Sequence, residues 1–95
     1  MVNSLVSSHR DEIISIARRH GAHNIRIFGS YVRGEERHGS DLNLLGDIDP
    51  DKSLLDQVAL IQDLEAVLNI HVDVVESQYL HWFIKEKVLF EAVPL

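Results

Sequence analysis

Two short segments carry residue types and spacings that could bind a phosphorylated ligand. The first is Gly29-Ser30, which follows the alternating apolar segment 24–28 and precedes residues that can begin a helix. A strand that ends where a helix begins presents unpaired backbone N–H groups, and with the serine hydroxyl these donors suit an anion. The second contains Asp41, separated from Ser30 by ten residues, and Asn43. In a strand, such i, i+2 positions project from one face. A phosphate cradle that faces two oxygen ligands predicts a site for a metal-bound nucleoside triphosphate.

A third segment, 70–75, adds an acidic residue to an alternating apolar pattern. The alternation places His71, Asp73 and Val75 on one face of a strand, and we expect this face to point inward. A carboxylate among β-branched residues is costly unless it is paired, binds a metal or lies near water. Asp73 is therefore a second, independent indication of a site. The structural alternatives are a hydrogen bond at a strand edge for Asp73 and a strand-start cap for Asp41.

The elements that must position these residues form an alternating series of helices and strands. Periodicity and capping residues predict helices over 3–20, 53–69 and 78–91, and strands over 24–28, 41–48 and 70–75. This series predicts an α/β (α+β) fold, with a small mixed β-sheet flanked by helices.

Two of the predicted helices carry further expectations. Helix 53–69 has a wide apolar stripe and is expected to face the core along its length; the stripe consists of Leu54, Leu55, Val58, Ile61, Leu64, Val67 and Leu68. In helix 78–91, Tyr79 and Trp82 are expected to be partly exposed and are candidates for contact with a partner. Leu95 is expected to pack back onto the domain.

The polar segment 35–40 predicts a surface loop, and it contains His38 close to the candidate site. A loop histidine is more often solvated than catalytic. A role for His38 as a general acid would need a supporting group that the sequence does not show.

The composition fits one globular domain over residues 1–95, of which 45% are hydrophobic. The absence of cysteine excludes disulfides and thiolate metal sites. A formal net charge of −6 argues against direct nucleic-acid binding, whose affinity comes largely from Lys and Arg. The sequence shows no signal-peptide pattern, and no apolar run approaches the about 20 residues of a membrane span. We therefore expect a cytoplasmic protein that contacts no membrane and binds a protein or a small nucleotide.

The ordered pattern G-S-x10-D-x-N resembles G-S-x10-D-x-D, the signature of the nucleotidyltransferase superfamily related to DNA polymerase β. The chain is similar to its smallest branch, the minimal nucleotidyltransferases, which are often encoded beside a HEPN-domain protein. The resemblance covers nearly the whole chain and rests on segments 29–35, 40–45, 49–55, 72–75 and 91–95. It implies a polymerase β-like fold.

The resemblance also implies which residues would bind the nucleotide. Gly29 and Ser30 would hold the β- and γ-phosphates of ATP, Arg33 would contact a phosphate, and Gly34 would allow close approach of the backbone.

The same resemblance implies a Mg²⁺ site formed by Asp41, Asn43 and Asp73. Asp41 would bridge two metal ions, and Asp73 would bind the metal nearer the acceptor and assist deprotonation of the acceptor. Asn43 departs from the family, which has a second bridging aspartate there. An amide oxygen can bind Mg²⁺ but carries no formal charge, so we expect impaired turnover. Either the residue was changed deliberately to trap a nucleotide or a complex, or the chain is a natural member that works by binding.

The resemblance implies the antitoxin of a type VII-like toxin–antitoxin pair. As a protein adenylyltransferase, it would move AMP from ATP to a tyrosine hydroxyl of a HEPN ribonuclease toxin, with which it would form a hetero-oligomer. The alternative is a non-catalytic antitoxin that neutralises its HEPN partner by binding alone. Transfer to a small molecule such as an aminoglycoside is a weaker hypothesis, because such enzymes usually carry an additional domain. An α/β domain without a nucleotide site is the remaining possibility.

Overall fold

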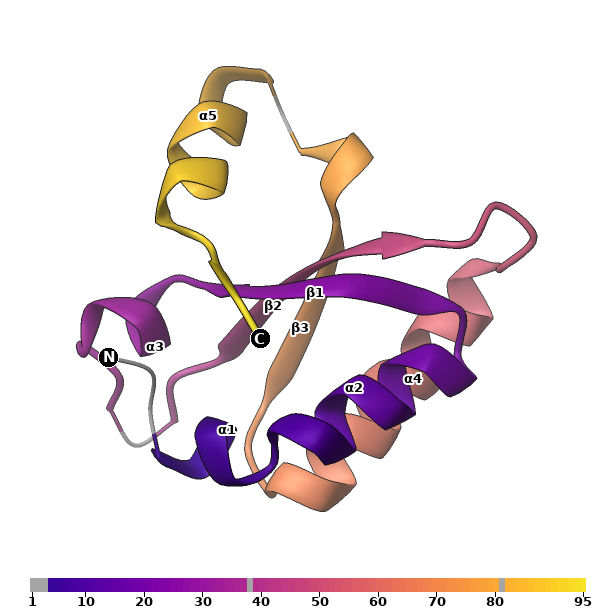
Figure 1. The fold of residues 1–95 in the computed structure, drawn as a ribbon, viewed down its shortest axis with the longest axis horizontal. Coiled ribbons are helices and arrows are strands. Elements are labelled where there is room, and N and C mark those ends of the chain that lie inside the picture. Colours follow the sequence, from indigo (N-terminus) through magenta and orange to yellow (C-terminus); the bar gives the residue numbers. More distant parts are fainter. Residues whose placement is uncertain (1–3, 38, 81) are drawn as a thin grey trace.

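The computed structural model describes residues 4–37, 39–80 and 82–95, so His38 lies outside the described residues. These residues form one sheet with helices on both faces (Figure 1). The elements, in chain order, are α1 (Ser4–Ser8), α2 (Arg10–Arg19), β1 (Ala22–Phe28), α3 (Ser30–Arg33), β2 (Leu42–Ile48), α4 (Leu54–Leu68), β3 (Val72–Glu76), the 3₁₀ turn η1 (Ser77–Tyr79), α5 (Trp82–Glu91) and β4 (Val93–Pro94).

The sheet has the strand order β3-β2-β1-β4 and is mixed. Strand β1 runs antiparallel to β2 and β4, whereas β2 and β3 are parallel. A parallel pair needs a crossover connection, and α4 provides it between β2 and β3. The predicted α/β (α+β) fold with a small mixed sheet is therefore confirmed.

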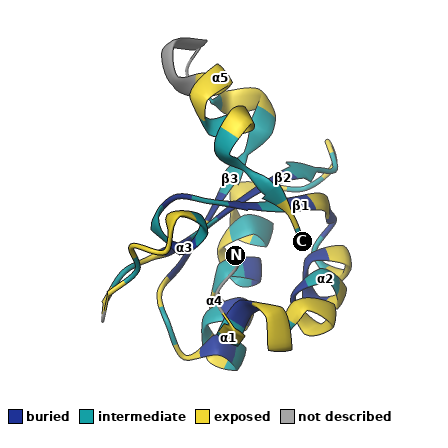
Figure 2. Cartoon of the chain, turned by 60° about the vertical axis from the view of Figure 1, so that its left-hand side comes forward, coloured by how far each residue is buried: buried dark blue, intermediate teal, exposed yellow. Residues whose placement is uncertain are grey.

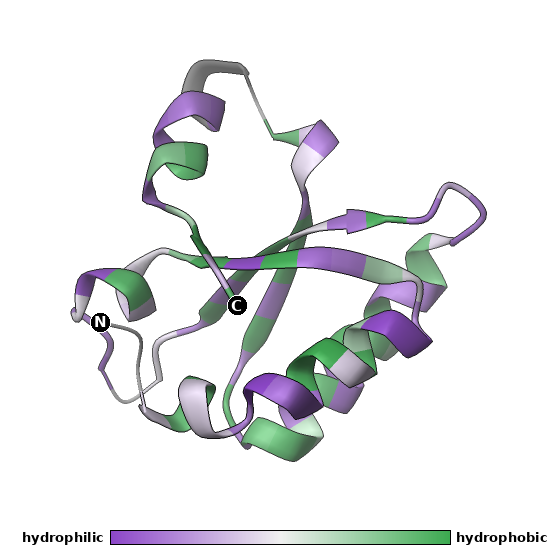
Figure 3. Ribbon diagram, viewed as in Figure 1, coloured by the Kyte–Doolittle hydropathy of each residue, from purple (hydrophilic) through white to green (hydrophobic). Residues whose placement is uncertain are grey.

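The core lies between the sheet and the helices α1, α2 and α4 (Figure 2). Hydropathy varies along the ribbon of the strands (Figure 3), and the core cluster includes the buried strand residues Ile27, Leu42, Leu44, Val72 and Val74. On β3 this buried set is Val72 and Val74, while Asp73 is exposed. The prediction that Asp73 points inward is wrong, because the valines supply the apolar surface that the helices cover. The opposite face of the sheet, which carries Asp73, lies on the side of α5 (Figure 2).

The predicted helix 3–20 is divided at His9 into α1 and α2. The Oγ of Ser8 donates to the carbonyl of Leu5 at 3.0 Å, and Nδ1 of His9 lies 2.9 Å from the same oxygen. Side-chain bonds of this kind compete with the regular helical hydrogen bonds. The N–H of His9 instead bonds to Val6 O at 3.2 Å, and the helix restarts at Arg10.

Helix α4 confirms the predicted ends of helix 53–69. Ser53 and Asp56 form a capping box at the N-terminus, and Asn69 ends the helix in the left-handed conformation. The core-facing prediction is wrong for the first turns, where Leu54 is 74%, Leu55 79% and Val58 41% exposed. On this part of α4, the Nε2 group of Gln57 donates a hydrogen bond to Val74 O of β3 at 2.7 Å.

The C-terminal segment adds a strand that the sequence pattern did not predict. Val93 and Pro94 pair with β1, and Leu95 N–H donates to Ile25 O at 3.0 Å. Proline is tolerated because β4 lies at the sheet edge. Leu95 packs against the core as expected. Within the predicted helix 78–91, the α-helix begins only at Trp82.

The described side chains around these last elements remain largely exposed. Tyr79 is 76% exposed, as predicted, and Phe90 of α5 is 94% exposed. The side chain of Trp82 lies outside the described residues. Across the part of the chain that is described, no helix is long and apolar enough to cross a membrane.

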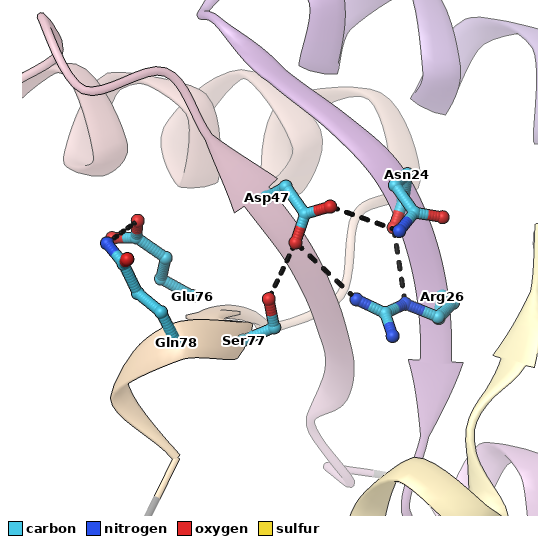
Figure 4. A network of polar contacts seen from close by, with 6 residues as sticks. All are labelled: Asn24, Arg26, Asp47, Glu76, Ser77 and Gln78. Carbon is cyan, nitrogen blue, oxygen red and sulfur yellow. Dashed lines mark hydrogen bonds and ion pairs between the residues drawn. The ribbon is translucent and has the colours of Figure 1, made fainter.

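A polar network links β1, β2 and η1 at the end of the sheet remote from Gly29 (Figure 4). Asp47 of β2 accepts hydrogen bonds from Ser77 Oγ at 2.6 Å and Asn24 Nδ2 at 3.0 Å, and lies 3.7 Å from Arg26. The hydrogen bonds from Ser77 and Asn24 lower the pKa of the Asp47 carboxyl, with a smaller contribution from Arg26. The network fixes the point at which the chain leaves β3 toward α5.

Candidate active site

Strand pairing brings the predicted metal ligands together. In the sheet register, Asn43 of β2 lies opposite Asp73 of the parallel strand β3 and opposite Phe28 of the antiparallel strand β1. The neighbouring pair Leu42 and Val72 is buried against the helices. Because side chains alternate along a strand, Asn43 and Asp73 project from the other face of the sheet.

Asp41 completes this group at the head of β2. It lies two residues before Asn43 and is exposed, as is Asp73, whereas Asn43 is half-buried. Within the described residues, none of these three side chains forms a hydrogen bond or ion pair. The three oxygen-bearing groups are therefore available to a ligand.

Gly29, which directly precedes the predicted phosphate-binding residue Ser30, lies next to the predicted metal ligand Asn43. Its φ of 84° and ψ of −154° lie in a region that only glycine readily occupies. A Cβ atom at this position would lie 2.8 Å from Nδ2 of Asn43, which is closer than van der Waals contact allows. Gly29 therefore packs closely against the Asn43 side chain, whereas the close backbone approach expected at Gly34 stays a prediction.

Gly34 has a different structural role. It ends α3 in the left-handed conformation, with a φ of 72°. A Cβ atom at Gly34 would meet no described atom within 4 Å beyond its chain neighbours, and the preceding residue Arg33 is exposed. The left-handed backbone conformation is by itself a sufficient reason for a glycine at position 34.

The cradle itself is formed by the start of α3. Gly29 O accepts hydrogen bonds from the N–H groups of Val32 at 3.0 Å and Arg33 at 3.3 Å. In the described part of the chain, the N–H groups of Ser30 and Tyr31 have no backbone partner. These two donors and the Ser30 hydroxyl are available to an anion, and the phosphate-binding role of Gly29-Ser30 stays a prediction.

Tyr31 is a site neighbour that the sequence reasoning missed. It is 6% exposed and belongs to the hydrophobic core. Burial raises the pKa of the Tyr31 phenol, and the nearby carboxylates of Glu36 and Asp41 raise it further. The only sequence feature that could have pointed to Tyr31 was its position directly after Ser30. Tyr31 anchors the cradle in the core beside Asp41.

Arg33, the predicted phosphate contact, is engaged by two carboxylates. Its guanidinium donates hydrogen bonds to Glu35 and to Glu91 at the end of α5. These bonds raise the pKa of Arg33, with Glu35 as the larger cause. A phosphate at Arg33 would have to share or replace these partners, so its predicted role stays a prediction.

The donor set determines which metal these residues could hold. The described residues contain no group of three or more His, Cys, Asp or Glu side chains placed to bind a metal ion. Asp41 and Asp73 contribute two carboxylates, and Asn43 adds an amide oxygen. Hard oxygen donors suit Mg²⁺, which commonly binds through one or two carboxylates and substrate phosphates. The residues therefore fit one Mg²⁺ held jointly with a nucleotide, and a second ion would have Asp41 but not the second bridging carboxylate, which Asn43 replaces.

Replacing Gly29 by alanine should destabilise the domain by about 1–3 kcal/mol, because the backbone conformation is nearly restricted to glycine. The new methyl group would also displace Asn43. Thermal unfolding followed by circular dichroism should show a melting temperature lower by roughly 5–15 °C. The matched control is Gly34→Asn, because asparagine tolerates the left-handed conformation. Equal melting temperatures for Gly29→Ala and the original chain would contradict the close contact.

A small mixed sheet that places a Gly-Ser turn beside acidic residues of two parallel strands is a nucleotidyltransferase architecture. The sequence model of the nucleotidyltransferase domain matches residues 10–95, so the chain belongs to this family. The predicted resemblance to minimal nucleotidyltransferases is thereby confirmed.

Curated relatives carry the name of a more specific activity. The protein adenylyltransferase MntA of Thermococcus cleftensis is 38% identical over 92 residues, which cover 97% of this chain and 90% of the relative. A Methanocaldococcus jannaschii protein, provisionally named a protein adenylyltransferase, is 40% identical over 90 residues, covering 95% of this chain and 97% of the relative.

Solved structures share the fold. A protein provisionally described as a minimal nucleotidyltransferase superimposes with a TM-score of 0.88 at 40% identity, covering 100% of this chain and 97% of that one. A toxin–antitoxin structure with AMP-PNP has a TM-score of 0.76 at 22% identity, with coverages of 88% and 69%. A complex of a tri-AMPylated Shewanella oneidensis HEPN toxin with its MNT antitoxin has a TM-score of 0.71 at 19% identity, with coverages of 93% and 69%.

Proposed function

We propose that this chain is a Mg²⁺-dependent protein adenylyltransferase that transfers AMP from ATP to a tyrosine hydroxyl of a HEPN toxin. The observation that carries this proposal is the register that places Asn43 beside Asp73, with Gly29 in contact with Asn43. The residues proposed as phosphate donors, at the start of α3, thus lie next to those proposed as oxygen ligands, on β2 and β3. The names of the curated relatives support the same activity.

The residues have distinct roles in the proposed reaction. The N–H groups of Ser30 and Tyr31 and the Ser30 hydroxyl would bind the β- and γ-phosphates, which leave as pyrophosphate. Asp41, Asn43 and Asp73 would hold Mg²⁺ through their side-chain oxygens. The bound ion would neutralise charge on the phosphates and activate the attacking oxygen. With one neutral ligand at Asn43, we expect slow turnover.

The transfer itself is a substitution at the α-phosphorus. An oxygen lone pair of the phenol forms the new P–O bond, and the bond from that phosphorus to the bridging oxygen breaks. Pyrophosphate leaves with the electron pair, and the phenolic proton passes to water. The protein mainly positions the two reactants, as in other phosphoryl transfers.

A HEPN toxin is the proposed acceptor because an MNT antitoxin of similar fold forms a complex with a tri-AMPylated HEPN toxin. The chain has a formal net charge of −6, which suits a partner with a basic, RNA-binding surface. AMP on such a surface would add negative charge and bulk that oppose RNA phosphates.

Asn43 favours a second candidate function, in which the chain neutralises its partner by binding alone. A single amide in place of a carboxylate lowers the negative charge available to metal ions. The exposed apolar side chains of Tyr79 and Phe90 offer contact area to a protein partner. In this case the nucleotide site would be vestigial.

Intact-mass measurement of a co-encoded HEPN protein would distinguish the two functions. The partner is incubated with ATP, Mg²⁺ and either this chain or its Asn43→Asp form. The enzymatic proposal expects the mass of one or more AMP units on the partner, with more after incubation with the Asp form. Unchanged mass in both reactions, together with lower ribonuclease activity, would instead support the binding-only function.

A further inference from the structure

Arg33, the predicted phosphate contact, is held by a carboxylate on each of two nitrogens. Its Nε atom donates to Glu35 in the loop after α3, and its Nη1 atom donates to Glu91 at the end of α5. A guanidinium has five N–H donors, and among the described residues Nη2 has no partner. A bidentate phosphate contact uses two adjacent nitrogens, so it would include Nε or Nη1. These are the two nitrogens that the carboxylates now occupy.

The charges of this group explain why one carboxylate must leave before a phosphate binds. Arg33, Glu35 and Glu91 comprise one positive and two negative side chains, so the group carries one net negative charge. A triphosphate is itself strongly negative and would be repelled. Ser30 and Arg33 are three residues apart in α3, and such positions are neighbours on one helix face. Arg33 can therefore attract a nucleotide at the cradle only after a carboxylate has moved away.

Glu35 is the carboxylate that can move at little cost. Its side chain is 62% exposed, whereas that of Glu91 is 19% exposed. The N–H of Glu35 donates to Ser30 O at 2.9 Å, so the backbone is fixed and only rotation of the side chain is needed to free Arg33. An exposed ion pair contributes little to stability, so its loss costs little.

Glu91 is restrained by the structure around it. It ends α5, and after one residue the chain enters β4, which pairs with Arg26 and Ile27 of β1. These β1 residues lie just before the turn at Gly29. Strand pairing therefore fixes the segment that carries Glu91 beside the strand that leads into the cradle.

We propose that Glu35 and Glu91 have opposite roles in nucleotide binding. Glu35 occupies Arg33 in the absence of nucleotide and is displaced by a phosphate of the incoming triphosphate. Glu91 stays bonded and holds the guanidinium in position. Glu35 is thus a competing carboxylate, and Glu91 is a positioning residue. This proposal rests on the proposed function for the identity of the ligand, ATP.

The affinity for ATP tests the competition. ATP with Mg²⁺ is titrated into the full chain and followed by isothermal titration calorimetry. Glu35→Gln nearly keeps the size of the side chain but removes its charge, and should tighten ATP binding about twofold to fivefold. In the Arg33→Ala background, Glu35→Gln should give no gain, because the competition requires Arg33. The matched control is Glu86→Gln, which removes an exposed carboxylate of α5 without a described partner and should leave the affinity unchanged.

Carboxyl ¹³C signals in NMR spectra show which glutamate moves. The side-chain carboxyl signals of Glu35 and Glu91 are assigned from the signal that is missing in Glu35→Gln and in Glu91→Gln. On addition of ATP, the Glu35 signal should shift toward that of the exposed Glu86, whose carboxylate is unpaired among the described residues. The Glu91 signal should stay near its original position.

Two affinity results would overturn the competition: equal or weaker ATP binding by Glu35→Gln, or a gain that persists without Arg33. Movement of the Glu91 signal in place of the Glu35 signal would overturn the assignment of the two roles. The proposed function is tested separately by the mass of the partner. ATP binding with the expected shifts but without AMP transfer would reject the enzyme and keep the competition at Arg33, whereas absence of ATP binding would reject both.

Discussion

Replacing Asp41 by alanine is expected to abolish AMP transfer while leaving the domain folded. Asp41 lies at the head of β2, is exposed and forms no hydrogen bond or ion pair with another described residue, so its loss removes no structural contact. Its carboxylate would be one of only two that hold Mg²⁺ against the phosphates. Loss of an outer partner of a metal site typically costs 10–100-fold, so loss of a direct ligand should lower transfer by at least about 100-fold.

The assay for Asp41→Ala is the rate of AMP incorporation into the partner, measured from intact masses in the Asn43→Asp background. Binding of the partner is measured in parallel and should survive, because the substitution changes one side chain next to the substrate. Asp51→Ala is the matched control, since Asp51 is an exposed aspartate in the turn before α4. Transfer by Asp41→Ala at the rate of the control would exclude Asp41 as a metal ligand.

Replacing Asn43 by aspartate is expected to raise Mg²⁺-dependent transfer by about 100-fold, the order of magnitude that one well-placed electrostatic group contributes in an active site. The two side chains are nearly isosteric, and Asn43 contributes no described hydrogen bond, so the fold should be unchanged. A carboxylate at this position would stand beside Asp73 in the register and would supply the second bridging carboxylate that Asn43 replaces.

The same variant has a readout that does not depend on transfer. Without metal, like charges on neighbouring strands should destabilise it by about 0.2–1 kcal/mol, which lowers the melting temperature by a few degrees. Mg²⁺ should restore or exceed the original melting temperature in Asn43→Asp and should have a smaller effect on the original chain. Identical activity and identical Mg²⁺ response in both forms would contradict the role of position 43 as a metal ligand.

Several features of this chain follow from local sequence because local forces decide them. Helix α4 begins and ends where Ser53 and Asn69 predict, since caps act within one turn. The Gly-Ser turn after β1 likewise follows from the end of an alternating segment at a residue that can adopt a positive φ.

Features that depend on partners distant in sequence were predicted poorly. The alternation around Asp73 defined two faces but could not say which one the helices cover, and the expected face was the wrong one. Helical periodicity predicted Leu54 and Leu55 inside, but both are exposed, because which turns of a helix are covered depends on how it packs on the sheet. Strand β4 has only two residues, which is too few for a strand pattern to be recognised in the sequence. It forms because Val93 and Pro94 pair with β1.

The sequence by itself determined the family, the set of candidate ligands and the positions of most helices and strands, because motif spacing and periodicity are properties of consecutive residues. Only the tertiary structure decided that Asn43 lies against Gly29 and beside Asp73, and that Arg33 is held by Glu91. These contacts join segments far apart in the chain. They depend on strand register and helix packing, which form only when the whole domain folds.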